Sequence, residues 1–211
     1  MDANQVAMLR EALSRTGWLD RTRDFARALR TSTRRPGGLL LLGTPEAEPW
    51  HLAAHLDDES HLSGIPELAP TLVRWRPPAG APPHLRIGLE RLTTAGRGET
   101  VFVVAEETAP VPLLERVDDA RRTGAVILAL DGGDGDRELE GLAHETLNVP
   151  AHRGLVSFDG AQHLVSAAAG EPGPPRRGGR EQGPGPGPAG AKTLRERLAR
   201  FLDVVSGPSA D

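Results

Sequence analysis

The sequence predicts an α/β fold, a three-layer α/β/α sandwich around a mainly parallel sheet. Four consecutive leucines, Leu39 to Leu42, form a short apolar run between glycines, which is typical of a strand buried on both faces. Residues 100–105 form a second such run, rich in β-branched and aromatic side chains. Segments with apolar residues at helical spacing separate the strand-like runs, and right-handed crossovers would then place helices on both faces of the sheet.

The expected order from residue 38 onward is strand, helix and strand in strict alternation, with five strands. Before it, apolar residues recur at spacings of three and four through residues 2–33, and Gly17 marks a break between two helices. The opening strand and helix occupy residues 38–58. The further strands are predicted at 71–75, 100–105, 125–130 and 146–149, and the further helices at 85–92, 111–124, 137–144 and 158–169.

This pattern divides the chain into four parts. Residues 1–36 form an N-terminal helical segment, and residues 37–169 form the α/β domain. Residues 170–190 are so rich in glycine and proline that they have almost nothing to bury, which predicts a disordered linker. Residues 191–206 place leucine, phenylalanine and valine on one helical face, which predicts an amphipathic helix that needs a partner surface.

Composition excludes several classes of protein. The 211 residues suit one domain with appendages, and the absence of cysteine excludes disulfides, thiol catalysis and thiolate metal sites. A net charge of -4 gives no electrostatic footprint for nucleic acid. No apolar run approaches the roughly 20 residues that cross a bilayer, and the first residues lack an apolar leader. We therefore expect a soluble cytoplasmic protein without a nucleic-acid or membrane partner.

Four stretches carry a resemblance to a known family. They are the amino-terminal helix, the unit LLLLGTPEAEPWHLAAHL, the stretch from Ala95 to Pro150 with its helix ending in RRTGA, and the helix FDGAQHLVSAAA. Their succession, over residues 5–169, resembles the sugar isomerase (SIS) domain family, which binds phosphosugars on a parallel-sheet sandwich. The resemblance implies the same fold, a sugar or sugar phosphate as ligand, and a homodimer formed through the terminal helices.

The chain departs from the family at the loops that hold phosphate. Sugar-phosphate binders have a serine-rich loop after the strand equivalent to residues 101–105, because hydroxyls and free N–H groups hold the anion. Here the two loops contain Glu46, Glu106 and Glu107, and prolines remove backbone donors. Each carboxylate repels a phosphate charge by about 1 kcal/mol at 4 Å in water. We therefore predict a non-catalytic, SIS-like ligand-binding or regulatory module with a weakened or altered phosphosugar site.

The alternative functions are a phosphosugar aldose-ketose isomerase with a non-standard active site and an unrelated flavodoxin-like or receiver-like scaffold. A receiver needs an acidic pair after its first strand and an aspartate ending a central strand, whereas this chain has Thr44, Glu46 and Ala105 there. No GxSxG motif supports a hydrolase.

The candidate ligand-binding residues lie in the two loops, which meet if the first and third strands are neighbours. One interpretation is a polar pocket for a cationic or hydroxyl-rich ligand, or for Mg²⁺ that bridges carboxylates to a phosphate. The other, which we favour, is that the acids only complement helix N-termini, worth about 0.3–1 kcal/mol each. The candidates are Gly43, Thr44, Glu46, Glu106, Glu107 and Thr108.

Histidines and acids give the remaining candidates. The acid–base candidates, if catalysis occurs, are Glu106, Glu107, His144 and His163, because family isomerases use glutamate and histidine near the sugar ring. His51 and His55 share a helical face at zinc-binding spacing, but the adjacent glutamate of the metalloprotease motif is missing.

We interpret the two histidines as a solvated polar face, and we predict no metal site and no cofactor. Asp131, Asp134, Asp136 and Glu138 resemble a calcium loop in composition only, so we interpret them as an acidic turn that caps a helix.

Overall fold

A five-stranded parallel sheet forms the centre of the molecule. The computed structural model describes residues 17–133, 135–149 and 156–171. The strands run in the order β2-β1-β3-β4-β5, and each neighbouring pair is parallel. Their bounds are β1 Leu39–Leu42, β2 Pro70–Leu72, β3 Thr100–Ala105, β4 Val126–Gly132 and β5 Glu145–Val149.

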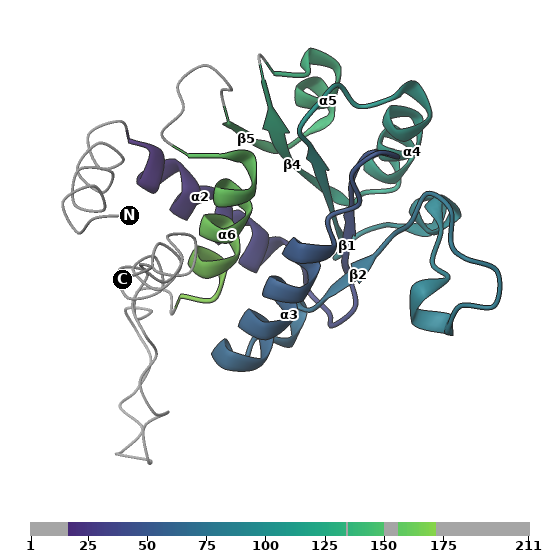
Figure 1. Cartoon of the computed structure of the whole chain (residues 1–211), viewed down its shortest axis with the longest axis horizontal. Coiled ribbons are helices and arrows are strands. Elements are labelled where there is room, and N and C mark those ends of the chain that lie inside the picture. Colours follow the sequence, from purple (N-terminus) through teal and green to yellow (C-terminus); the bar gives the residue numbers. More distant parts are fainter. Residues whose placement is uncertain (1–16, 134, 150–155, 172–211) are drawn as a thin grey trace, which may run out of the picture.

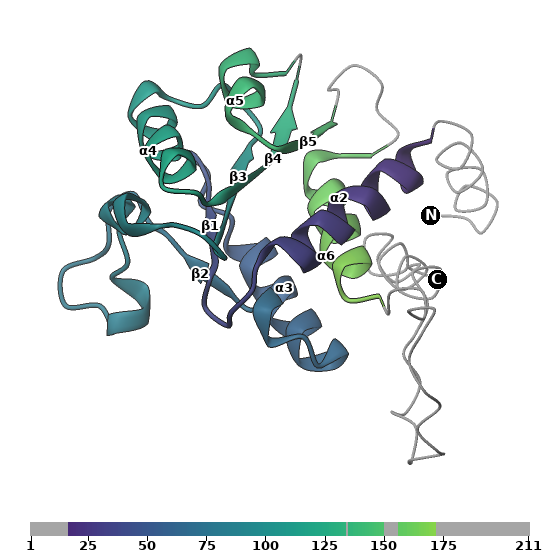
Figure 2. The same ribbon diagram turned by 180° about the vertical axis from the view of Figure 1, so that it is seen from behind.

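Helices cover both faces of the sheet, as Figures 1 and 2 show from opposite sides. One layer consists of α2 (Trp18–Ser32), α3 (Trp50–Ser63) and α6 (Phe158–Ala169). The other consists of α4 (Val111–Arg122), α5 (Arg137–Leu142) and the short 3-10 helix η3 (Leu89–Thr94). The predicted three-layer sandwich is confirmed.

The apolar runs in the sequence explain why both faces are covered. Every residue of β1 and β3 is buried. Since side chains alternate between the faces of a strand, Leu39 and Leu41 pack on the layer that holds α2, while Leu40 and Leu42 pack on the layer that holds α4. Phe102 of β3 meets Phe25 of α2 with ring centroids 5.5 Å apart.

Helix α2 belongs to the core of the sandwich. It begins directly after Gly17, whose φ is 68°, and the predicted helix before Gly17 lies outside the described residues. Trp18, Phe25 and Leu29 are buried in the same cluster as the sheet. Residues 1–16, the predicted linker of 170–190 beyond residue 171, and the predicted helix of 191–206 lie outside the described residues. The division of the chain into four parts stays a prediction.

The segment between β2 and β3 differs from the prediction. The second strand ends at Leu72, and Arg74 makes only a single parallel bridge to Gly88. The predicted helix over 85–92 is wrong, because two 3-10 turns, Pro83–Leu85 and η3, take its place. Gly88 is extended (φ -102°, ψ -178°) and therefore interrupts the helix.

The connections out of β1 and β3 diverge. The chain leaves β1 through α3 on one face and leaves β3 through α4 on the opposite face. In open α/β sheets, ligands bind where such connections separate, outside the carboxyl ends of the strands. None of the helices in the described ranges is long and apolar enough to span a membrane.

Candidate functional site

The two predicted loops leave neighbouring strands at the same edge of the sheet. β1 pairs with β3 in the register Leu42 to Val103, so the premise that these strands are neighbours is confirmed. Gly43 and Thr44 are buried, whereas the other four ligand candidates are exposed. A Cβ atom on Gly43 would lie 2.0 Å from the carbonyl oxygen of Ala47, so this turn requires glycine.

The exposed acids of these loops do not cap helices. Neither α3 nor α4 has an acidic residue in its first turn, because both loops continue for several residues before the helix begins. The interpretation of Glu46, Glu106 and Glu107 as helix-terminal charges is therefore not supported. Their side chains make no hydrogen bond or ion pair with the described part of the chain, and they remain available to a ligand.

A concave pocket of about 630 Å³ lies beside the carboxyl ends of β1 and β2. Of the predicted ligand residues, only Glu46 lines this pocket. Its neighbour Pro45 also lines it. The remaining lining comes from the start of α3 and from the segment that follows β2. These residues are Ala47, Glu48, Trp50, Arg74, Trp75 and Arg76.

Glu48 holds the walls of the pocket together. Its Oε2 atom accepts hydrogen bonds from Arg74 Nε at 3.0 Å and from Trp50 Nε1 at 3.1 Å, and Arg74 Nη2 lies 2.9 Å away. Its Oε1 atom accepts the backbone N–H of Trp75 at 3.2 Å. The Glu48 and Arg74 side chains are 14% and 15% exposed. A half-buried, charge-assisted network of this kind preorganises the pocket.

The two indoles contribute different surfaces. Trp75 Nε1 donates to the Gly43 carbonyl oxygen at 2.8 Å, so both indole N–H groups of the pocket are already used within the protein. Trp50 is nevertheless 43% exposed, and the Arg74 guanidinium lies 4.6 Å from the centroid of its ring. Two glutamates and two arginines give the lining a balanced charge.

Sequence reasoning missed this pocket because Glu48 and Arg74 come from segments that only the fold brings together. One signal was present. The chain has three tryptophans, and two of them, Trp50 and Trp75, stand in the segments at the carboxyl ends of the first two predicted strands.

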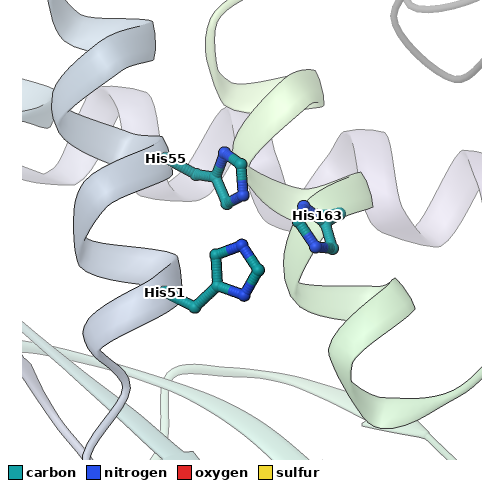
Figure 3. A group of neighbouring side chains, drawn as sticks. All are labelled: His51, His55 and His163. Carbon is teal, nitrogen blue, oxygen red and sulfur yellow. The ribbon is translucent and has the colours of Figure 1, made fainter. Parts of the chain in front are cut away.

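A second group of polar side chains lies between α3 and α6 (Figure 3). His51 and His55 project from α3 toward His163 of α6, and the ring centroids are 4.3–4.6 Å apart. One nitrogen from each ring lies within 4.8 Å of the others. His51 is exposed and the other two are half-buried. The interpretation of His55 as part of a solvated face is wrong, because α6 packs against α3 there.

Burial makes His55 and His163 poor bases. It lowers the pKa of His55, an effect to which the neighbouring His51 adds. Burial, together with His55 and His51, lowers the pKa of His163 to about 4. Both rings are therefore neutral at pH 7. The Nε2 atom of His55 is buried and has no hydrogen-bond partner among the described residues.

His144 lies at the opposite edge of the sheet from the acidic loops. Its ring Nδ1 accepts a hydrogen bond from the backbone N–H of Ile127 at 2.9 Å. The backbone N–H of His144 donates to the Ile127 carbonyl oxygen. This contact also explains why α5 ends at Leu142 instead of His144. Ile127 is at the beginning of β4, and Glu106 follows the end of β3. At about 3.3 Å per strand residue, His144 and Glu106 are roughly 16 Å apart.

The carboxylates of the acidic turn after β4 accept hydrogen bonds from backbone N–H groups. Asp136 is the N-cap of α5, where its Oδ1 accepts the N–H groups of Glu138 at 3.0 Å and Leu139 at 3.1 Å. The predicted helix-capping role is confirmed for Asp136, while Asp134 lies outside the described residues. Burial raises the pKa of Asp131, and the hydrogen bonds that it accepts from the Asp136 N–H and from Asn148 offset only part of this.

Comparison with known proteins gives fold-level neighbours only. No family model matches the chain, and no curated protein matches it. A proposed sugar-binding protein from Salmonella typhimurium is similar at 16% identity, with 78% of this chain and 46% of that chain covered and a TM-score of 0.47. A proposed phosphosugar isomerase from Silicibacter pomeroyi has 14% identity, coverage of 79% and 48%, and a TM-score of 0.49. The chain thus spans less than half the length of either protein.

Proposed function

We propose that the protein is a non-catalytic, SIS-like ligand-binding module whose altered site takes a hydroxyl-rich small molecule such as a sugar derivative. The observation that carries this proposal is the pocket at the carboxyl ends of β1 and β2, with its exposed Trp50 ring and its Glu48–Arg74 network. Its volume of about 630 Å³ is within the range of small-ligand sites, roughly 300–1,000 Å³.

The lining suits a sugar better than a dianionic phosphate. A sugar ring offers an apolar C–H face, which packs on an indole, and a rim of hydroxyls, which pair with charged side chains. The Trp50 ring would pack on the apolar face of the sugar, and the exposed side chains of Glu46 and Arg76 would pair with its hydroxyls. The balanced charge leaves no excess of cations for a phosphate, in keeping with the serine-poor loops.

The positions of the acid–base candidates favour binding over catalysis. A general base and acid must both come within hydrogen-bond reach of one substrate. His144 lies at the amino edge of the sheet, His163 is packed between two helices, and Glu106 and Glu107 extend from the opposite edge. These four residues do not converge on a single substrate position.

Ligand titrations of the full chain test the proposal. Two of the three tryptophans line the pocket, so intrinsic fluorescence and thermal shift report occupancy together. We expect saturable binding of at least one neutral or amino sugar from a panel, with weaker binding of its phosphate. Trp50→Ala should weaken that binding at least tenfold. Leu62→Ala, at a 75% exposed position later in the same helix, is the matched control and should leave it unchanged.

Two outcomes would overturn the proposal. One is that no sugar binds, or that binding is insensitive to Trp50→Ala. The other is an aldose-ketose isomerase activity that Glu106→Gln or Glu107→Gln abolishes, which would establish the enzymatic alternative instead.

A further inference from the structure

We propose that His51, His55 and His163 form a binding site for one divalent transition-metal ion, with Zn²⁺ the best match. This site is separate from the proposed sugar pocket, and it requires no ligand in that pocket. Three side chains from two helices converge there, and each can offer one ring nitrogen (Figure 3).

The spacing of the nitrogens fits a metal after a small adjustment. They lie within 4.8 Å of one another, whereas tetrahedral Zn²⁺ with Zn–N bonds near 2.0–2.1 Å separates its ligands by about 3.4 Å. His51 and His55 are four residues apart on α3 and therefore share a face of the helix. His51 is exposed, so its ring is free to rotate toward the other two without disturbing the core.

The chemistry of the three rings also matches. A histidine binds metal through an imidazole nitrogen, and the half-buried rings of His55 and His163 each place one such nitrogen in the cluster. The buried Nε2 of His55 has no hydrogen-bond partner among the described residues, which is unusual for a polar atom in a packed interface. A metal ion would provide that partner.

The surroundings would tolerate the charge of the ion. Asp58 acts electrostatically on His55, and Asp159 acts on His163, so each helix brings a carboxylate near the cluster. Three histidines leave the fourth position of a tetrahedral ion open to water or to an external ligand, and the exposed side of His51 gives access to it. The bound ion would link α3 to α6.

A metal titration of the untagged, chelator-treated full chain tests this site. We expect one Zn²⁺ per chain in competition with a chromophoric chelator, a higher melting temperature, and a visible absorption band of four-coordinate character with Co²⁺. His163→Ala should lower the affinity by about 100-fold, because loss of a ligand should cost at least as much as loss of a second-shell partner. His61→Ala, an exposed histidine of the same helix, is the matched control and should retain wild-type affinity.

The variants separate the three-histidine site from simpler explanations. Equal Zn²⁺ affinity in wild type and His163→Ala would show that the pair on α3, or a site elsewhere, binds the ion, and would overturn the proposal. So would the absence of stoichiometric binding to wild type, which would leave the rings as helix packing only. If His163→Ala does not fold, His51→Ala at the exposed ligand decides the question by the same criterion.

Discussion

At the scale of single residues, Glu99 is the most completely buried charged residue in the described part of the chain. Its side chain is 1% exposed, immediately before β3. Its carboxylate accepts hydrogen bonds from Arg91 and from the Gly96 N–H at 3.0 Å, and Arg35 lies 2.6 Å away. Burial alone would raise the pKa of Glu99, but the hydrogen bonds from Arg35, Arg91 and Gly96 outweigh it and hold the pKa below its usual value.

Replacing this carboxylate should destabilise the protein in a pH-dependent way. Glu99→Gln leaves two arginines without their anion, and we expect a loss of about 2 kcal/mol at pH 7. This is less than the 3–5 kcal/mol of a fully buried pair, because the Arg35 side chain is 63% exposed.

The pH dependence follows from the direction of the shift. A lowered folded pKa contributes stability that is complete above the unfolded value, about 4.3, and is lost as the pH falls through the folded pKa. Denaturant unfolding of wild type and Glu99→Gln at pH 7 and pH 3.5 checks this. An equal difference at both pH values would contradict the ion-pair explanation.

At the scale of elements, Asp136 joins two loops at the carboxyl edge of the sheet. Besides capping α5, its Oδ2 accepts the N–H of Ala109 at 2.8 Å, at the end of the loop that carries Glu106 and Glu107. This carboxylate therefore fixes the start of α5 and the approach to α4 together.

Removing that carboxylate should cost more than an ordinary N-cap. Asp136→Ala loses the cap, worth about 0.5–2 kcal/mol, and leaves the buried N–H of Ala109 without its partner, which costs about 1–3 kcal/mol. We expect about 2–4 kcal/mol less stability in denaturant unfolding. Asp136→Asn keeps one acceptor oxygen for the cap and should lose clearly less. A stability of Asp136→Asn equal to that of wild type would show that the contact with Ala109 contributes nothing.

Elements whose character is local were predictable from the sequence, and those made by distant partners were not. The leucines of β1 and the β-branched run of β3 specify buried strands by themselves. Leu89 and Leu92 have a spacing that fits a 3-10 helix as well as an α-helix, so the pattern could not separate the two. His163 and Arg74 acquire their significance only when α6 and the segment after β2 reach α3.

At the scale of the whole molecule, the proposed sites share α3. Trp50 begins this helix at the pocket, and His51 and His55 face α6 from its next residues. The sequence predicts a pocket between β1 and β3, whereas the pocket lies on the other side of β1, beside β2. The reason is that Glu48, in the loop after β1, binds Arg74 in the segment after β2. The direction of a loop depends on such long-range ion pairs, which neither periodicity nor composition contains.

The predicted amphipathic helix of residues 191–206 offers a means of self-association. Leu198 and Leu202 lie on its apolar face, which must be covered by another surface. If that surface belongs to a second copy of the chain, Leu198→Asp with Leu202→Asp should reduce the mass measured by light scattering from that of a dimer to that of one chain, 22.4 kDa. Arg200→Asp puts the same side chain on the polar face and should leave the dimer intact. A wild-type monomer, or a double variant of unchanged mass, would exclude this helix as the dimer contact.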